Sequence, residues 1–136
     1  MSVQLISPPG LMQPVPYHHV AIATGTRQVH IAGQVARDEA GLPVAPRDLA
    51  GQVAQVLRNT AAGLRGAGAG FEDVVRLAFY VTEWTPDRIG DFMAGVEQVR
   101  DELNLPNPLP PASLIGVAYL FEPDVLVELE AIAVLA

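Results

Sequence analysis

Two glutamates near the end of the chain are the first residues whose type and spacing could serve chemistry. Glu128 and Glu130 alternate with the apolar residues Val127, Leu129 and Ala131. Because side chains alternate between the faces of a β-strand, both carboxylates are predicted to share one face of a sheet, where they repel each other unless water or a partner stabilises them. Two interpretations of Glu128 stay open: it lies on an exposed sheet face, or it belongs to a site that uses its charge.

Arginine supplies all the positive charge of the chain. The sequence has 8 basic residues, all of them arginines, against 15 acidic ones, and the net charge is −7. The absence of lysine excludes a Schiff-base lysine and a phosphate-loop lysine. The absence of cysteine excludes a catalytic thiol, a thiolate metal site and a disulfide framework. The net negative charge argues against a surface that binds phosphate backbones, so we expect no nucleic-acid partner.

The three histidines do not have the spacing of a metal site. His18 and His19 are adjacent, so in a strand they point to opposite sides and cannot chelate one ion together. His30 has no ligand-type partner at a suitable spacing. We interpret the three as surface or packing residues and expect neither a metal nor another cofactor.

The chain is predicted to form a single domain over residues 1–136. No repeat, low-complexity tract or linker divides it, and a domain of this size buries roughly two-thirds of its unfolded surface without a disulfide or metal. Residues 1–10 lack the basic-then-apolar pattern of a signal peptide, and no apolar run reaches the roughly 18 residues that span a bilayer. We therefore expect a soluble cytoplasmic protein that does not contact a membrane.

Apolar periodicity predicts six strands and two helices. The strands are expected at residues 3–7, 17–24, 27–32, 73–83, 112–121 and 125–135, and the second and third are expected to form a hairpin around Gly25. One helix begins at Leu49 and ends at the glycines of residues 66–70, and the other has Thr85 as its N-cap and Pro86 at its first position. The order β-β-β-α-β-α-β-β predicts an α+β sandwich: one mixed sheet with two helices on one face.

Several short segments also occur in a characteristic order. They are Pro16-Tyr17, Ile31-Ala32-Gly33-Gln34, the helix from Leu49, Phe79-Tyr80-Val81-Thr82, Pro111-Ala112 and the terminal run from Val127 to Ala133. Together they cover nearly the whole chain and resemble the Rid family, the reactive intermediate deaminases, also called the YjgF family. The resemblance implies a chorismate-mutase-like fold and a homotrimer with a small-molecule ligand cleft at each subunit interface.

The apolar content of the strands gives separate support for a trimer. A six-stranded sheet with helices on one face leaves its other face to be covered. The runs 76–81 and 114–121 carry more apolar residues than burial on one side needs. Packing three such sheets around an axis would bury that surplus. The alternative is an ordinary core with apolar residues on both sides of the sheet.

The resemblance also implies the chemistry of a site. Active members hydrolyse the enamine or imine tautomer of a 2-amino acid to a 2-keto acid and ammonia. By position, Glu128 would activate or position the water, Tyr17 would cover the ligand, and Gly33 would bring its backbone close to the ligand, as glycine allows. Asp91 stands where many members have asparagine. Tyr17 could instead be a packing residue, and Gly33 is needed for its turn in any case.

The sequence departs from the family at the residue that should hold the substrate. In the family an arginine directly follows the Pro-Ala pair and binds the substrate carboxylate, but here Pro111-Ala112 is followed by Ser113. Loss of a desolvated charge pair costs about 2–5 kcal/mol of binding. Ala32 also replaces the family's usual serine before the glycine. Ser113 could be a ligand contact or a strand serine satisfied within the fold, and Arg37 is the candidate considered for replacing the missing arginine.

Three functions follow from these residues. The first is a trimer that binds a small metabolite in its inter-subunit clefts without efficient 2-iminoacid hydrolysis. The second is a hydrolase in which Glu128 positions water to cleave an imine, an enamine or a related C–N bond of a substrate without the carboxylate. The third is endoribonuclease activity, which the net charge of −7 and the lack of interleaved basic and aromatic residues disfavour.

Overall fold

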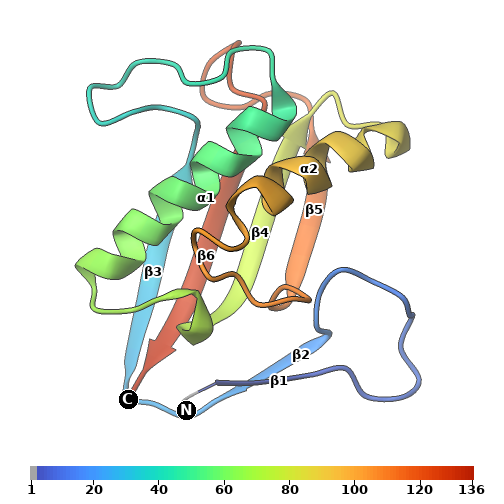
Figure 1. Ribbon diagram of the computed structural model, residues 1–136, viewed down its shortest axis with the longest axis vertical. Helices are drawn as coiled ribbons and strands as arrows, with labels where there is room; N and C mark the ends of the chain where they lie inside the picture. Colours follow the sequence, from blue (N-terminus) through green and yellow to red (C-terminus); the bar gives the residue numbers. More distant parts are fainter. Residues whose placement is uncertain (1–2) are drawn as a thin grey trace.

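A four-stranded mixed sheet organises the protein, whose computed structural model describes residues 3–136. The strand order is β3–β6–β4–β5, with β6 antiparallel to both of its neighbours and β4 parallel to β5. Both helices cover the same face of this sheet (Figure 1), as the α+β prediction requires. The predicted single domain also includes Met1 and Ser2, which lie outside the described residues. The strands are β3 (Arg27–Gln34), β4 (Val74–Thr82), β5 (Ala112–Val117) and β6 (Val127–Leu135).

Helix α1 (Leu49–Gly66) forms where the apolar spacing predicts it. The side chain of Asp48 accepts a hydrogen bond from the backbone N–H of Gly51 and so caps the first turn. The apolar stripe that faces the sheet is fully buried, and glycine-rich sequence follows the last turn. No helix within residues 3–136 is long and apolar enough to cross a membrane.

Helix α2 (Ile89–Val99) begins later than its sequence suggests. Pro86 opens a separate 3-10 turn, Pro86–Arg88, and Thr85 makes no side-chain capping bond to it. The helix then packs Phe92 against Phe79 of β4, with ring centroids 4.9 Å apart in an edge-to-face arrangement. This contact closes the core between the helices and the central strands.

The predicted hairpin between residues 17–24 and 27–32 does not form. Strand β2 (Val20–Ala23) pairs instead with β1 (Val3–Ile6) in a separate two-stranded antiparallel sheet. The backbone N–H of Thr26 donates a hydrogen bond to the carbonyl of Leu135. From Arg27 onwards, β3 then pairs with the final strand, β6. The expected six-stranded sheet is thus a four-stranded sheet with a two-stranded ribbon at one end (Figure 1).

Strand β5 is also shorter than predicted. It ends at Val117, and residues 118–126 form a loop instead of continuing the strand to 121. Tyr119 and Phe121 in this loop are 64% and 73% exposed. Their apolar side chains resemble those of a strand in the sequence, although they lie mostly exposed.

The face of the sheet opposite the helices is uncovered in this chain, and we call it the open face. Strand alternation and the observed register place two sets of side chains on it, polar and apolar. Ile115 is 44% exposed there. The residues of the open face are His30 and Ala32 from β3, Arg76, Ala78 and Tyr80 from β4, Ser113 and Ile115 from β5, and Glu128, Glu130 and Ile132 from β6.

Candidate functional site

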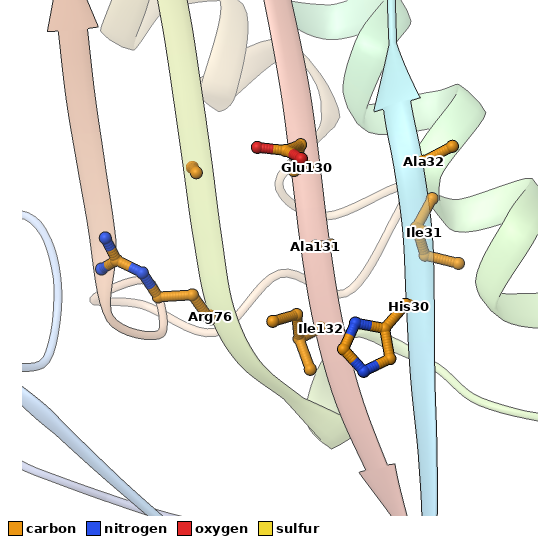
Figure 2. Close-up of a pocket in the computed structure, with 8 residues that line it drawn as sticks. His30, Ile31, Ala32, Arg76, Glu130, Ala131 and Ile132 are labelled. Carbon is orange, nitrogen blue, oxygen red and sulfur yellow. The ribbon is translucent and has the colours of Figure 1, made fainter.

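The open face is hollowed over its centre. A cavity of about 400 Å³ lies there, and its lining comes from the three strands β3, β6 and β4 (Figure 2). Ala32 and Ala78 leave room on either side of Glu130, because a methyl group is the only side chain at each position. The lining residues are His30, Ile31, Ala32, Arg76, Ala78, Glu130, Ala131 and Ile132.

Arg76 and Ser113 are joined across two neighbouring strands of this face. The Nη2 group of Arg76 donates a hydrogen bond of 2.5 Å to the Oγ atom of Ser113. The parallel register of β4 and β5, which places Ser113 beside Ala78, brings the two side chains together. Residue 113 is therefore not an arginine, but the guanidinium of Arg76 from the neighbouring strand lies beside it.

Tyr80 and Glu130 form a second polar pair on the same face. The phenol of Tyr80 donates a hydrogen bond of 2.7 Å to Oε1 of Glu130. This bond, with further contributions from burial and from the charges of Glu130 and Glu128, raises the pKa of the Tyr80 phenol. Tyr80 is therefore a neutral donor at physiological pH, and it fixes one oxygen of the carboxylate.

Gly33 and Glu128 lie against each other at an irregularity in the pairing of β3 with β6. The register shifts between Ile31 and Gln34, so Gly33 falls outside the regular ladder. A Cβ atom on Gly33 would overlap the carboxylate of Glu128. The glycine thus provides the space in which that carboxylate sits, and Glu128 itself is half-buried.

Tyr17 lies beside a different depression. An apolar groove of about 260 Å³ runs between the N-terminal segment, helix α2 and the edge strand β5, and both Tyr17 and Ser113 line it. Tyr17 is held there by backbone bonds between its neighbours and Leu109, namely His18 N–H to the Leu109 carbonyl at 2.7 Å and Leu109 N–H to the Pro16 carbonyl at 3.0 Å. Its ring also packs edge-to-face on His19.

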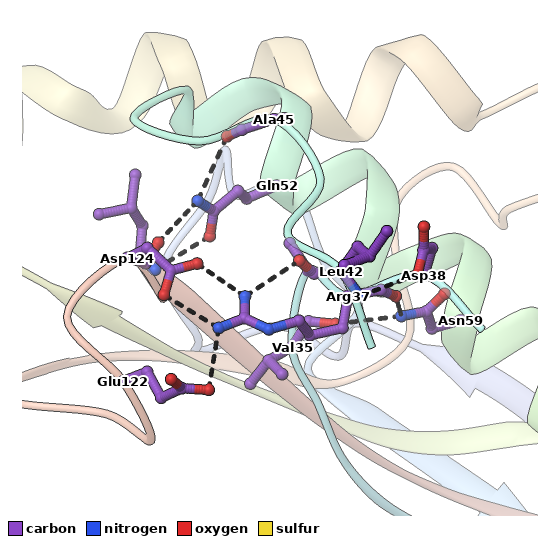
Figure 3. A network of polar contacts seen from close by, with 11 residues as sticks. Val35, Arg37, Asp38, Leu42, Ala45, Gln52, Asn59, Glu122 and Asp124 are labelled. Atoms are coloured by element: carbon purple, nitrogen blue, oxygen red, sulfur yellow. Dashed lines mark hydrogen bonds and ion pairs between the residues drawn. The ribbon is translucent and has the colours of Figure 1, made fainter. Parts of the chain in front are cut away.

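Asp91 and Arg37 lie away from both depressions. Asp91 is exposed on α2. Arg37 makes a two-pronged ion pair with Asp124, with hydrogen bonds of 2.7 and 2.9 Å, and a third bond of 3.1 Å to Glu122 (Figure 3). Its guanidinium is therefore engaged in joining the loop after β3 to the loop before β6. This arrangement lends no support to the hypothesis that Arg37 replaces the missing arginine, which stays a prediction.

The histidines do not come together. Within the part of the chain that the structure describes, no group of three or more histidine or carboxylate side chains could hold a metal ion. His19 bonds to the Met12 carbonyl at 2.8 Å, and His30 bonds to the side chain of Gln28 at 3.1 Å.

The predicted site residues thus fall into four places in one chain. Ala32 borders the cavity of the open face, Tyr17 and Ser113 border the apolar groove, Gly33 lies against Glu128, and Asp91 lies exposed on α2. Sequence reasoning did not assign a role to Arg76 or Tyr80. Their alternation with Ala78 along one strand places them on one face, but only the strand register shows which partners they meet.

Comparisons with known proteins agree with this architecture. Residues 11–135 match a family model described as Endoribonuclease L-PSP. A Rid-family protein of unknown function from Yersinia pestis, YyfB, is 37% identical over 99% of this chain and 100% of its own, with a TM-score of 0.88. The structure of E. coli TdcF with bound serine is 25% identical over 98% of this chain and 99% of its own, and E. coli YjgF is 27% identical over 96% and 98%, each with a TM-score of 0.67.

No curated protein matches the chain at a significant level. The family match nevertheless spans almost the entire sequence, and the solved structures reproduce both the order and the packing of its elements. This chain therefore belongs to the Rid/YjgF family.

Proposed function

We propose that the protein is a homotrimer that binds a small metabolite in clefts between its subunits and does not efficiently hydrolyse 2-iminoacids. The observation that carries this proposal is Ser113. By the order of the motifs in the sequence, its neutral hydroxyl corresponds to the family arginine, and it accepts a hydrogen bond from Arg76. A hydroxyl supplies no charge to a substrate carboxylate, whereas an arginine there would bind it through two parallel hydrogen bonds.

The uncovered open face supports assembly from copies of this chain. It combines apolar residues such as Ile115 and Ile132 with charged ones, and the helices shield only the opposite side. Three sheets packed around an axis would bury these apolar side chains. The same packing would bring together site residues that are far apart in one chain, such as Asp91 and the Gly33–Glu128 pair.

The paired charges of the open face support a small polar ligand. Arg76 and Glu130 both line the 400 Å³ cavity, and a pair of opposite charges suits a molecule that carries a carboxylate and a nitrogen. TdcF, which shares 25% of its residues with this chain, has been crystallised with bound serine. We therefore propose amino acids and related small molecules as the ligand class.

A hydrolase that uses Glu128 is the second candidate. The packing of Gly33 on the Glu128 carboxylate favours it, because a carboxylate held beside the backbone is placed to orient a water molecule. This enzyme would act on an imine, an enamine or a related C–N bond. RNA cleavage has less support, since the net charge of −7 disfavours a surface that binds phosphates.

The decisive assay generates 2-iminoacids in situ with an amino-acid oxidase and measures the release of 2-keto acid. We expect little acceleration by this protein, and acceleration equal to that of an arginine-bearing family member would contradict the proposal. Ser113→Arg alone would crowd two guanidinium groups, so the informative variant is the double substitution Arg76→Gln, Ser113→Arg. We expect it to gain 2-iminoacid hydrolysis if the rest of the site is intact.

Sedimentation velocity tests the assembly. We expect a trimer, and Ile115→Asp on the open face should dissociate it because three buried carboxylates would meet near the axis. Leu42→Asp is the matched control, since Leu42 is 60% exposed in the loop between β3 and α1. A wild-type monomer, or equal behaviour of the two variants, would exclude assembly through this face.

A further inference from the structure

We infer that the loop after β5 in one copy of the chain covers the apolar groove of the next copy, so that two subunits complete each groove. The side chains that make this contact are Tyr119 and Phe121, which we call the aromatic tip. The inference rests on the proposed assembly of copies of this chain, and it adds a contact that is separate from the open face.

The aromatic tip is exposed although its loop is firmly held. Tyr119 and Phe121 are 64% and 73% exposed. The same loop is fixed at Asp124, whose carboxylate accepts hydrogen bonds of 2.7 and 2.9 Å from Arg37 (Figure 3). The amide of Gln52 donates to the backbone carbonyl of Asp124 at 2.9 Å as well. Burial of aromatic side chains on an anchored loop costs little conformational entropy, which suits them as anchors of a protein interface.

The apolar groove offers a matching surface. Among the described residues that line it, none carries a charge, and its volume is about 260 Å³. Two of its apolar side chains are left exposed in the single chain, Met12 at 70% and Ile89 at 46%. An aromatic ring placed in the groove would therefore remove apolar surface from water on both sides of the contact.

The aromatic tip lies away from the groove of its own chain. Neither Tyr119 nor Phe121 lines that groove. Ser113 lines it from the start of β5, whereas the tip comes after the end of this strand at Val117. Figure 1 shows the loop after β5 at one end of the main sheet and the N-terminal segment, which forms one side of the groove, at the other. The tip and the groove are thus two separate patches of one molecule.

Two different patches on one chain suit a closed ring of identical copies. In a threefold ring, each contact joins one patch of a copy to a different patch of the next copy. Both patches adjoin β5, which is the edge strand of the main sheet and carries Ile115 on the open face. The proposed contact therefore continues the interface that we propose around the axis.

The charge of the chain favours a second copy as the occupant of the groove. Each copy has a net charge of −7, so two copies repel each other unless they meet through uncharged surfaces. Residues 118–121, Ala-Tyr-Leu-Phe, are uncharged, as are the described residues that line the groove. An anionic lipid surface is a poorer partner for the tip, because it would repel the negative chain.

This contact would complete the site that the sequence predicts around the groove. Tyr17 and Ser113 border the groove, and the aromatic tip of the next copy would exclude water beside them. Each groove would thus have its inner wall from one chain and its cover from another.

Cysteine cross-linking tests the contact directly, because the chain has no cysteine of its own. Met12→Cys and Phe121→Cys chains, each with a different affinity tag, are co-expressed and then oxidised. We expect a covalent dimer that carries both tags, and little covalent dimer from either variant alone, because the contact joins two different patches. Met12→Cys co-expressed with Leu42→Cys is the control, since Leu42 is 60% exposed in the loop between β3 and α1 and should give no dimer with both tags.

Sedimentation equilibrium measures the contribution of the same side chains to assembly. Phe121→Ser should raise the concentration at which the trimer dissociates by about tenfold or more, because it removes a buried aromatic anchor. Met12→Ser should weaken the trimer less. The double variant should be no weaker than Phe121→Ser alone, because the two side chains contribute to one contact. Leu42→Ser should leave the trimer unchanged.

The outcomes distinguish this inference from the proposed assembly. If the wild type is a monomer at all concentrations, the proposed assembly fails and the inference fails with it. If the wild type is a trimer but no dimer with both tags forms between Met12→Cys and Phe121→Cys, only the inference fails. If the effects of Met12→Ser and Phe121→Ser on dissociation simply add, the two side chains belong to different contacts and the inference is overturned.

Discussion

Gly33 leaves the space that the Glu128 carboxylate fills. The two residues face each other from β3 and β6, where the register of the ladder shifts, and a side chain on Gly33 would overlap the Glu128 carboxylate. The conformation of this carboxylate therefore depends on a residue that has no functional group of its own.

The first prediction concerns Gly33→Ala. The overlapped atoms are the flexible end of Glu128, so the carboxylate should swing away and the fold should lose no more than about 1 kcal/mol of stability. Any hydrolysis that Glu128→Ala abolishes should be lost in Gly33→Ala as well. Thermal unfolding together with the imine assay measures both effects, and a fully active Gly33→Ala variant would show that the position of the carboxylate is unimportant.

The second prediction compares two glycines of helix α2. A Cβ on Gly95 would overlap the Ala50 carbonyl and the Val53 side chain where α2 crosses α1, whereas nothing lies within 4 Å of a Cβ on Gly90. Gly95→Ala should therefore cost about 1–3 kcal/mol of the free energy of unfolding. Gly90→Ala should be neutral or stabilise by up to about 1 kcal/mol, because alanine favours a helix. Urea denaturation of the two variants provides the comparison.

The third prediction concerns the buried amide of Gln52, which is 1% exposed on α1. Its nitrogen donates to the carbonyls of Asp124 and Ala45, and its oxygen accepts from the N–H of Leu126, as Figure 3 shows around Asp124. Gln52→Leu would leave these backbone groups unpaired and should destabilise the fold by about 2–5 kcal/mol. Gln98→Leu on the exposed side of α2 should change stability little, and equal effects of the two substitutions would contradict this account.

The fourth prediction is a pH dependence at the Arg37–Asp124 pair. Hydrogen bonds from Arg37, opposed in part by burial, lower the pKa of the Asp124 carboxyl. A carboxyl whose pKa is lower in the folded state stabilises the fold above its ordinary pKa of about 3.9, and that contribution is lost as the pH falls through the folded pKa. The difference in Tm between the wild type and Arg37→Gln should thus be largest at neutral pH and shrink below about pH 4.

Arg58 provides the comparison for this measurement. The side chain of Arg58 is 42% exposed in its pair with Glu102, against 16% for Arg37. Ion pairs at exposed positions contribute little, so Arg58→Gln should lower Tm less than Arg37→Gln at neutral pH. A larger effect of Arg58→Gln would show that burial does not decide the strength of these pairs.

The fifth prediction concerns the titration of Tyr80. Its phenol has a raised pKa, first because it donates to Glu130 and then because burial and nearby carboxylates disfavour the phenolate. Glu130→Gln removes one negative charge and should bring the pKa of Tyr80 back towards its ordinary value of about 10. Ultraviolet titration of the phenolate measures this shift, with Tyr80→Phe identifying the signal against Tyr17 and Tyr119. An unchanged titration in Glu130→Gln would exclude the bond as the cause.

Local patterns in the sequence predicted local structure well. The apolar stripe of α1 follows the period of a helix, and the alternation around Glu128 and Glu130 placed both carboxylates on one sheet face, as observed. The position of Pro86 also marked the region where α2 starts, although the proline opens a short 3-10 turn first.

Long-range pairing is what the sequence did not reveal. Residues 17–24 and 27–32 look like a hairpin because they are adjacent and apolar, but β3 pairs with β6, about a hundred residues later. The Arg76–Ser113 bond likewise depends on the parallel register of β4 and β5. The two carboxylate partners of Arg37, Glu122 and Asp124, also come from a loop that is distant in the sequence. Pairings of this kind are set by packing of the whole chain and not by neighbouring residues.

The separate ribbon of β1 and β2 has a consequence for ligand access. The ribbon is a two-stranded sheet separate from the main sheet. The segment around Tyr17 is joined to the rest of the protein by backbone hydrogen bonds with Leu109. Met12, Val15, Pro16 and Tyr17 line the apolar groove, and Ser113 lines it from the main sheet. The width of the groove between these two sides is therefore set by the backbone hydrogen bonds of Leu109 with Pro16 and His18.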